Sequence, residues 1–460
     1  MTPTNQHRRP AVEDALYRKV ALRVIPFLFV AYVVAFIDRI NIGFAQLQMK
    51  GDLGFSDAVY GLGAGIFFLG YFVFEVPSNL LLHKIGARRA FVRIMACWGL
   101  VSAGMAFVAA PWQLYVMRFL LGLFEAGFFP GIVLYLTYWF PSSRRATVTS
   151  WMFVGIAVAG VVGGIVSGTI MHHADGLHGL KGWQWMFILE GMPAVVLGIM
   201  ARWMIHDGPR SATWLTPQER DTLLARLGEE ERQKPPGAAH SLRAALGDVR
   251  VYLLAAVYFS LVCGTMAISF WLPAVIMAAG ARTLFEVGYL SAIPYGIGAV
   301  GILLISRHSD ARQERRWHYL ACTLGGGIAL LVLAFWARSL PAALLLLTIA
   351  VTFSFSGLPV FWTIPQRYLS GGVATAGGIA LINSLGQLGN FVSPAMIGWI
   401  KATTGRLDNG LFVLGALMMS GGVGLFVALR RLDATSAKPA SLGPIAPSAV
   451  MPKLGQPRST

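Results

Sequence analysis

Apolar residues along this chain gather into runs of roughly 20 residues or more, separated by short polar segments. As a helix, such a run is about 30 Å long, which matches the hydrocarbon core of a bilayer. The pattern therefore predicts an all-α integral membrane protein that spans the bilayer twelve times. The predicted spans are residues 24–45, 58–82, 90–109, 113–138, 147–171, 184–204, 251–279, 286–306, 318–337, 342–366, 376–400 and 410–429.

One long hydrophilic insert, residues 205–250, divides the spans into two groups of six. Within it, Thr216 and Glu219 form a capping-box pattern with Pro217 at the first helical position, which predicts a short helix running toward Glu231. Two six-span halves joined by a linker are typical of transporters built from repeated halves. We expect a cytoplasmic tail over 1–23, halves over 24–204 and 251–430, and a disordered tail, rich in Ser, Pro and Ala, over 431–460.

The charged residues predict how the chain is oriented. Only 13% of the residues are charged, whereas a soluble domain carries about 25%. The 37 Lys and Arg residues outnumber the 21 Asp and Glu residues, and most of them lie in alternate loops on the side of the N-terminus. The positive-inside rule then predicts cytoplasmic termini in a multi-pass protein of the cell inner (plasma) membrane. Because the basic residues follow topology, they do not indicate a nucleic-acid partner.

The cysteines and histidines do not suggest a metal site or a disulfide framework. Three cysteines lie far apart inside apolar runs, namely Cys97, Cys263 and Cys322. Three histidines share a short external loop with Asp175, namely His172, His173 and His178. This loop is interpreted as solvated rather than as metal-binding.

An acid and a base stand side by side inside the first span, Asp38 and Arg39. Each charge at that depth costs about 2.5–3.5 kcal/mol on the insertion scale unless it is paired or hydrated. A structural ion pair, or a span that ends early, is one explanation, and a functional site is the other. The functional explanation gains weight because a second acid and base occur in the fourth span.

Arg118 and Glu125 stand seven residues apart in the fourth span, about two helical turns, so both lie on one face. Arginine does not deprotonate in proteins, whereas a carboxylate can take up a proton. With Asp38 and Glu125 both ionised, the four charges sum to zero, and a proton on either acid leaves a positive surplus that an anion can neutralise. The four residues therefore predict coupling of proton entry to carboxylate entry, driven by a proton gradient with no cofactor or metal.

Polar side chains also form stripes along two other spans. The stripe of the second span consists of Tyr71, Glu75, Ser78 and Asn79, and that of the eleventh span of Asn383, Gln387 and Asn390. Each stripe is expected to face protein or a water-filled cavity, with hydrogen bonding between helices as the alternative. Trp362 of the tenth span offers an aromatic wall or simply packs, and Glu190 of the sixth span is interpreted as structural.

No Walker A, HExxH or GxSxG sequence occurs, which argues against ATP-driven transport and against a membrane hydrolase. Gly296-x-Gly298-x-x-Gly301 fits the dinucleotide-binding pattern, but it lies within an apolar span and follows no strand. Close helix packing explains it better, and the glycines between 155 and 168 are interpreted in the same way.

Several of these residues lie in segments that resemble the anion:cation symporter branch of the major facilitator superfamily, and the resemblance covers nearly all twelve spans. The segments are Asp38-Arg39-x-Asn41-Ile42-Gly43-Phe44-Ala45, Phe74-Glu75-Val76-Pro77-Ser78-Asn79-Leu80, Glu125-Ala126-Gly127-Phe128-Phe129-Pro130-Gly131, and Ser309-Asp310 with Glu314-Arg315-Arg316. They look most like those of the tartrate, phthalate and hydroxyphenylacetate permeases. Lys84-Ile85-Gly86-Ala87-Arg88 is similar to the superfamily's loop between spans two and three, although Asn79 and His83 replace its usual glycine and aspartate.

The resemblance implies proton-driven uptake of a small organic anion by alternating access. It implies that Asp38 and Glu125 carry protons and that Arg39 and Arg118 pair charges or bind the anion. The residues then expected to line the substrate cavity are Tyr71, Trp362, Asn383 and, from the same stripe, Gln387, with Asn41 and Glu75 as secondary candidates. The expected partners are the anion, protons and the lipid bilayer, and the protein is expected to act as a monomer.

Phe36 departs from the family pattern, since several relatives have a tyrosine two residues before the aspartate. A hydroxyl donor is missing there, so a polyhydroxylated substrate is less favoured. Two other functions stay open. An exporter of amphipathic compounds would need a wide apolar cavity and has less use for two buried arginines. A membrane enzyme acting on lipid-linked substrates would need a nucleophile or metal cluster at the membrane surface, where the sequence offers only the histidine loop.

Overall fold

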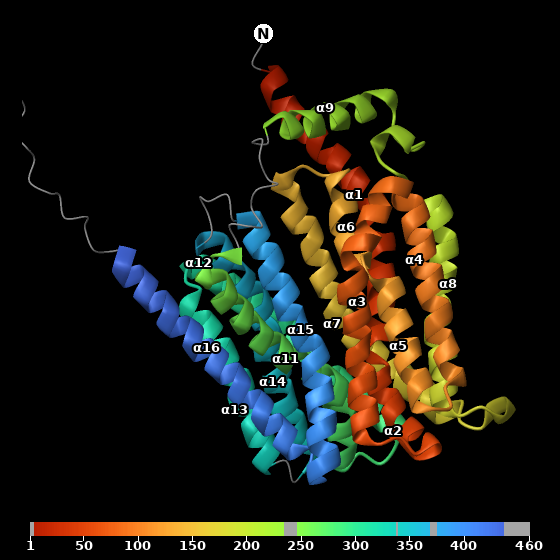
Figure 1. Ribbon diagram of the computed structural model, residues 1–460. Coiled ribbons are helices and arrows are strands. Elements are labelled where there is room, and N and C mark those ends of the chain that lie inside the picture. The colour runs from red at the N-terminus through yellow and green to blue at the C-terminus, as the bar shows by residue number, and fades with distance from the viewer. Residues whose placement is uncertain (1–3, 234–245, 337–338, 369–374, 437–460) are drawn as a thin grey trace, which may run out of the picture.

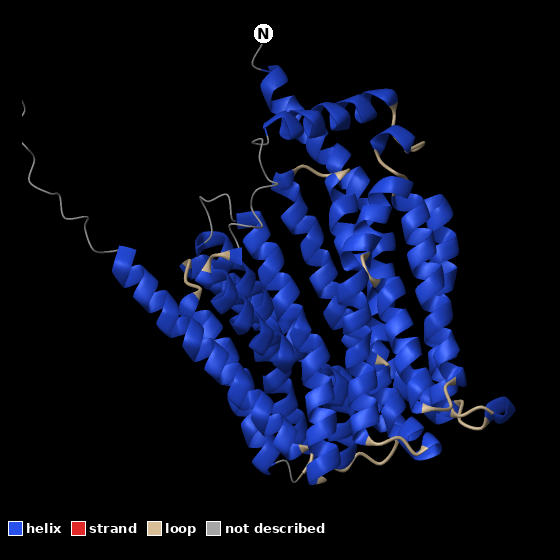
Figure 2. Cartoon of the chain, viewed as in Figure 1, coloured by secondary structure: helices blue, strands red, loops and turns tan. Residues whose placement is uncertain are grey.

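The computed structural model describes residues 4–233, 246–336, 339–368 and 375–436. Over these ranges the regular secondary structure is helical, without a strand (Figure 2), so the all-α prediction is confirmed. Eleven of the described helical segments are long and apolar enough to cross a membrane. The thirty-residue helix α15 (Thr375–Thr404) is not among them, because the polar stripe with Asn383, Gln387 and Asn390 lowers its hydropathy.

The helices form two halves. The N-terminal half contains α1 (Thr4–Ile40), α2 (Ile42–Leu53), α3 (Asp57–Ile85), α4 (Ala87–Gly104), α5 (Pro111–Glu125), α6 (Phe128–Thr137), α7 (Ser142–His173) and α8 (Gly182–Met204), with short turns at Met105–Phe107 and Leu177–Gly179. The C-terminal half contains α11 (Val249–Ala278), α12 (Leu284–Arg312), α13 (Arg316–Trp336), α14 (Leu340–Tyr368), α15 and α16 (Asp408–Ser436). With α1–α2 and α5–α6 each taken as one interrupted span, the described residues contain the twelve predicted segments.

The first and last helices extend beyond their predicted spans, because a helix can continue into water past its apolar part. The helix α1 begins at Thr4, inside the stretch that we expected to be a tail. The helix α16 continues to Ser436, beyond the predicted boundary at residue 430. Residues 437–460, most of the predicted C-terminal tail, lie outside the described residues.

The linker contains the predicted short helix, α9 (Pro217–Gln233), after a turn at Pro209–Ser211. Its capping box is formed, since the Thr216 N–H donates to Glu219 Oε2 at 2.9 Å and the Glu219 N–H donates to Thr216 Oγ1 at 3.3 Å. The helix lies across the N-terminal half, at the end that carries the chain N-terminus (Figure 1). Ion pairs attach it there: Lys19 to Glu219 at 2.7 Å, Glu13 to Arg226 at 2.6 Å, and Arg145 to Glu230.

The two halves meet at the opposite end of the bundle, here called the α2 end, which is at the bottom of Figure 1. There Gln46 Nε2 and Tyr60 Oη donate hydrogen bonds to the Phe270 carbonyl, at 3.0 and 2.9 Å. Lys401 Nζ reaches Asp57 Oδ1 at 3.1 Å and so joins α15 to α3. These contacts hold the bundle closed at the α2 end.

Small residues allow close helix approach, as predicted. A Cβ atom on Gly61 would lie 2.8 Å from Gly398 Cα, and one on Gly168 would lie 2.7 Å from Gly288 Cα, so both contacts between the halves require glycine. Within the C-terminal half, a Cβ on Gly298 would lie 2.9 Å from a methyl carbon of Val351. The packing interpretation of the glycine motifs is therefore confirmed.

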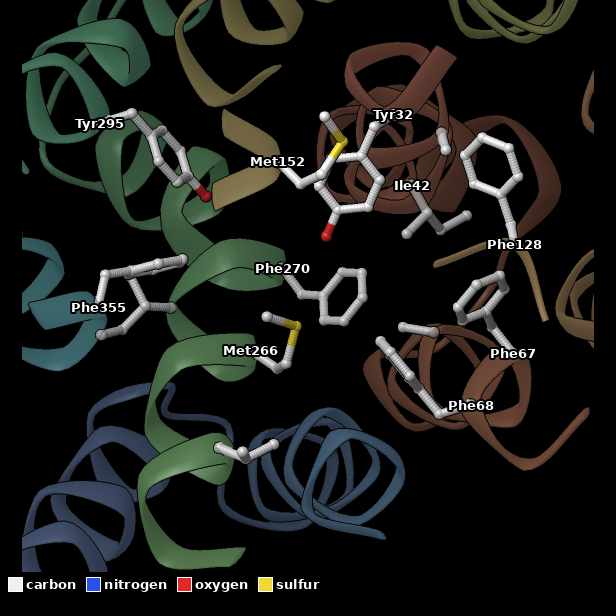
Figure 3. Packing of buried hydrophobic residues seen from close by; sticks show 14 of the residues in the cluster. Tyr32, Ile42, Phe67, Phe68, Phe128, Met152, Met266, Phe270, Tyr295 and Phe355 are labelled. Carbon is white, nitrogen blue, oxygen red and sulfur yellow. The ribbon is translucent and has the colours of Figure 1, made fainter. Parts of the chain in front are cut away.

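Aromatic and sulfur-containing side chains fill the region between the halves. Figure 3 shows Phe270 and Met266 of α11 pointing toward the same region as Phe68 of α3 and Tyr32 of α1. The rings of Phe68 and Phe270 contact edge-on, with centroids 6.1 Å apart. The surroundings of the buried charges are thus apolar, which strengthens every charge interaction among them.

Candidate functional site

Two helix interruptions place the charged residues of the site. The helix α1 ends at Ile40, and the chain turns at Asn41 before α2 begins. The helix α5 ends at Glu125, and Gly127 takes a positive φ of 81° before α6 begins. A Cβ on Gly127 would lie 2.7 Å from Ser78 Cβ, so both the backbone conformation and the neighbouring helix require glycine there. Each interruption directly follows a charged segment inside a span.

An ion pair joins the two interruptions. Arg39 Nη2 of α1 donates to Glu125 Oε1 of α5. The Glu125 side chain is 1% exposed and that of Arg39 is 16% exposed. Arg39 Nε and Glu125 Oε2 are buried and have no hydrogen-bond partner. The pair therefore leaves one donor and one acceptor free for a further ligand.

Arg118 lies about two helical turns before the break of α5, is fully buried, and makes no ion pair among the described residues. Its Nε and Nη2 donate long hydrogen bonds to the Gly63 and Ala64 carbonyls of α3, at 3.4 and 3.5 Å, and its Nη1 has no partner. The Phe67 ring connects it to Arg39, since their guanidinium carbons lie 5.0 and 5.3 Å from the ring centroid. Two guanidinium groups thus contact one aromatic ring, an arrangement that a bound anion would stabilise.

Asp38 points away from this group. Its carboxylate accepts hydrogen bonds from Trp98 Nε1 at 2.9 Å and from Ser102 Oγ at 2.7 Å, both on α4. Neighbouring residues of a helix diverge by about 100°, so Asp38 and Arg39 cannot both face Glu125. We did not single out Trp98 and Ser102 from the sequence, although their four-residue spacing in the third span marks one helix face.

Of the second-span stripe, Tyr71 is part of the arginine site and Glu75 is not. The Arg39 guanidinium carbon lies 5.4 Å from the centroid of the Tyr71 ring, and it also lies within 6 Å of the Phe36 and Phe68 rings. Glu75 lies a turn further along α3 and forms no ion pair within the described part of the chain. Its backbone carbonyl accepts a hydrogen bond from Asn79 at 2.9 Å.

The candidates of the C-terminal half form a separate group. On α15, Gln387 donates to Asn383 at 3.5 Å and accepts from Asn390, so the stripe is hydrogen-bonded within its own helix. Trp362 of α14 packs edge-on against Tyr258 of α11, with ring centroids 4.9 Å apart. A Cβ on Gly386 would lie 2.1 Å from the Tyr258 ring, so Tyr258 lies between Trp362 and this stripe. A substrate that contacts both groups must bind between the halves.

The two remaining candidates lie elsewhere. Asn41 is fully buried beside Glu190 rather than beside Arg39, and neither of its side-chain polar atoms has a hydrogen-bond partner. His172 and His173 pack against Phe285 at the α2 end. Among the described residues, no group of three or more His, Cys, Asp or Glu side chains could hold a metal ion.

Two six-helix halves around a buried set of charges define a polytopic membrane transporter. Residues 28–394 match the sequence profile of the Major Facilitator Superfamily, to which this chain belongs. It is 46% identical to an Agrobacterium vitis protein named for tartrate transport, over 91% of this chain and 92% of the relative. It is 39% identical to a quinolone resistance transporter of Acinetobacter baumannii, over 92% of this chain and 96% of the relative.

A solved structure agrees with the fold. A bacterial homologue of the human lysosomal transporter Spinster, in an inward-facing and unoccupied conformation, superposes with a TM-score of 0.73 at 16% identity. The match covers 90% of this chain and 97% of that one. The predicted resemblance to the superfamily is therefore confirmed, and because the family and these relatives are transporters, the membrane-enzyme alternative is set aside.

Proposed function

We propose that this protein is a proton-coupled symporter that takes up a small organic carboxylate by alternating access. The observation that carries the proposal is the Arg39–Glu125 ion pair, with Arg118 on the same aromatic ring. An acid that can take up a proton is thus paired with a base that cannot release one. Proton binding at Glu125 frees Arg39, and a carboxylate can then replace Glu125 as its partner.

The charge balance makes the two events interdependent. With Glu125 protonated and Asp38 ionised, the four buried groups carry one positive charge in excess, which is costly in apolar surroundings. An incoming carboxylate restores neutrality and can accept two parallel hydrogen bonds from a guanidinium. Asp38 is the second proton site of the proposal. Because it hydrogen-bonds to α4, its protonation would change the contact of α1 with α4 rather than the anion site itself.

The closed α2 end suggests which state of the cycle this is. With both termini in the cytoplasm, as the distribution of basic residues predicts, the α2 end is external and the described state faces inward. The Spinster homologue with a similar fold is itself in an inward-facing conformation. In the proposed cycle the halves rock about the region of Phe68 and Phe270, opening the contacts of Asp57 with Lys401 to admit substrate from outside.

The substrate is proposed to be a mono- or dicarboxylate of the tartrate, sugar-acid or aromatic-acid type. Relatives named for tartrate transport support a carboxylate. The rings around the Arg39 guanidinium, those of Phe36, Phe67, Phe68 and Tyr71, support a flat or apolar body next to the carboxylate.

Reconstitution tests the proposal. A thermal-shift screen of hydroxy, sugar and aromatic acids on the purified protein first identifies a ligand. Proteoliposomes are then given that radiolabelled acid with and without an inward proton gradient, and a protonophore is added as a control. We expect accumulation only with the gradient. Equal uptake with and without the gradient would contradict proton coupling, whereas no uptake of any carboxylate would contradict the substrate class.

Export of amphipathic compounds is the second candidate, favoured by one observation. The quinolone resistance relative matches over nearly its whole length, and the rings around Arg39 could also bind an aromatic drug. An exporter of this kind needs no buried anion site. If an aromatic compound binds equally well to the wild type and to Arg118→Ala, export is the better explanation. If Arg118→Ala abolishes carboxylate binding, symport is the better explanation.

A further inference from the structure

Glu190 of α8 is a buried carboxyl group that the Arg39–Glu125 site does not use. It is 5% exposed, and its Oε1 accepts a hydrogen bond from Ser167 Oγ of α7 at 2.6 Å. Its Oε2 is buried and has no partner. The other polar side chains that act on it are Asp38 and Asn41. No cation is among them in the described residues.

The elements around α8 leave Glu190 without a counter-charge. The helix α1 contributes Asp38, the break before α2 contributes Asn41, and α7 contributes Ser167. At this level α4 contributes the small residues Gly99, Ser102 and Ala103, which lie against Gly191. Near the start of α8, Asp52 of α2 accepts a hydrogen bond from Trp183 Nε1 at 2.9 Å and pairs with Lys181.

A proton on Glu190 would satisfy two unpartnered groups at once. An ionised carboxylate without a cation is strongly disfavoured in such surroundings, whereas a protonated one gains an O–H donor. The Asn41 side chain lies beside Glu190, and its Oδ1 is a buried acceptor without a partner. Protonated Glu190 can donate from Oε2–H to Asn41 Oδ1, and ionised Glu190 can accept from Asn41 Nδ2 instead, while Ser167 donates to Oε1 in both states.

Asn41 also links this carboxyl group to Asp38. The two residues are three apart, and Asn41 keeps helical backbone angles (φ −59°, ψ −28°), so they lie on neighbouring positions of one helix face. Ser102 of α4 donates to Asp38 Oδ1, and a Cβ on Gly191 would lie 3.0 Å from Ser102 Cβ. Asp38 and the Glu190–Gly191 turn of α8 therefore lie beside the same turn of α4.

We propose that Glu190 is a third protonation site of this carrier, which exchanges a proton with Asp38. The step is balanced: neutral Glu190 and ionised Asp38 become ionised Glu190 and neutral Asp38, with one proton transferred. Asn41 is a positioning residue, which orients the Glu190 carboxyl. Because two neighbouring buried carboxylates disfavour double ionisation, the two sites titrate as a pair. The inference rests on the proposed proton coupling.

The first test compares the wild type with Glu190→Gln, which keeps the shape of the neutral acid but cannot exchange a proton. Proton influx, followed with a trapped pH dye, and labelled substrate uptake are measured in the same proteoliposomes over a pH series. We expect a lower proton-to-substrate ratio and a shifted pH profile for Glu190→Gln. An unchanged ratio and profile would overturn the inference. If the wild type itself moves no protons with substrate, the proposed function fails instead.

A second test needs no transport and decides the case if Glu190→Gln is poorly folded. Infrared difference spectra between acidic and alkaline buffer record the stretch of protonated carboxyl groups in the purified protein. We expect Ser167→Ala to shift this band, because it removes the donor to Glu190 Oε1. The matched variant Ser356→Ala, a buried serine that bonds only to the Thr352 carbonyl of its own helix, should leave it unchanged. Identical bands in both variants and the wild type would overturn the inference.

Discussion

Arg39 and Glu125 form an ion pair between α1 and α5 at the two points where these spans are interrupted. The pair is buried, yet each partner keeps one polar atom without a hydrogen bond. The neighbouring Asp38 faces α4 instead and accepts hydrogen bonds from Trp98 and Ser102. Asp38 and Glu125, the two acids of the proposed site, therefore have separate surroundings. Protonation of each can affect a different part of the protein.

Glu125→Gln should uncouple uptake from the proton gradient, because glutamine can accept no proton and no longer pairs with Arg39 as an anion. We expect gradient-driven uptake to fall by roughly 100-fold, the scale for loss of a proton-transferring group. Exchange of labelled for unlabelled substrate should persist, since it needs no net proton movement. Active uptake by this variant at the wild-type rate would remove Glu125 from the mechanism. Glu286→Gln is the matched control: this partly exposed carboxyl group near the start of α12 accepts from the Arg282 N–H, which a glutamine side chain can also do.

Gly61→Leu should prevent closure at the α2 end, because Gly61 lies directly against Gly398 of α15. Overpacking of a tight contact costs about 1–3 kcal/mol, which shifts a two-state equilibrium by roughly 5- to 150-fold. Spin labels on the α2-end tips of α3 and α15 should report longer distances in this variant. Gly51→Leu is the matched control, since a Cβ at Gly51 meets nothing within 4 Å. Equal distances in both variants would contradict the assignment of this contact as the closing surface.

Acid should release α9 from the N-terminal half. The hydrogen bonds from the Lys19 ammonium and the Thr216 N–H hold the pKa of Glu219 below its usual value. The attached state is therefore stabilised at pH values above the ordinary glutamate pKa of about 4.3, and this contribution is lost as the pH falls through the lowered pKa. Hydrogen exchange in α9 should rise over that range.

The same experiment on two variants isolates the contact. Glu219→Gln should show raised exchange in α9 at neutral pH, because the ion pair with Lys19 is absent. Glu229→Gln should behave as the wild type, since Glu229 is exposed and contacts only Arg226 of the same helix, at 3.4 Å. If Glu219→Gln exchanges as slowly as the wild type at neutral pH, this ion pair does not hold α9 in place.

Phe36→Tyr should change substrate preference toward hydroxylated acids. The Phe36 ring is buried and lies 5.8 Å from the Arg39 guanidinium carbon, so a tyrosine there would place a hydroxyl group near the anion site. A hydrogen bond to a substrate hydroxyl contributes about 0.5–1.5 kcal/mol, or roughly 2- to 10-fold in relative affinity. Competition between a polyhydroxylated and an aromatic acid for labelled uptake measures this ratio. A ratio equal to that of the wild type would show that position 36 does not select substrate.

Sequence patterns predicted the fold closely, because bilayer thickness imposes span length and backbone hydrogen bonding imposes helix. The capping box at Thr216 and Glu219 was equally predictable, since it depends on four consecutive residues. The hydrogen bond between Gln387 and Asn383 of α15 also follows from local spacing alone, since residues four apart lie on one helix face. The contact of Tyr71 with Arg39 was not predicted, since the family resemblance implied only that Tyr71 lines the substrate cavity. The contact of Phe67 with Arg39 was not predicted either, because a phenylalanine in a span carries no signal of its own.

The sequence by itself determined which charges are buried in the membrane, since Asp38, Arg39, Arg118 and Glu125 all interrupt apolar runs. Only the tertiary structure decided which of these charged residues contact each other. Glu125 pairs with Arg39 of another helix rather than with Arg118 of its own, and Asp38 shares its surroundings with Glu190. The physical reason is that helical spacing specifies the direction of a side chain relative to its own helix, whereas the partner it meets depends on how distant helices pack.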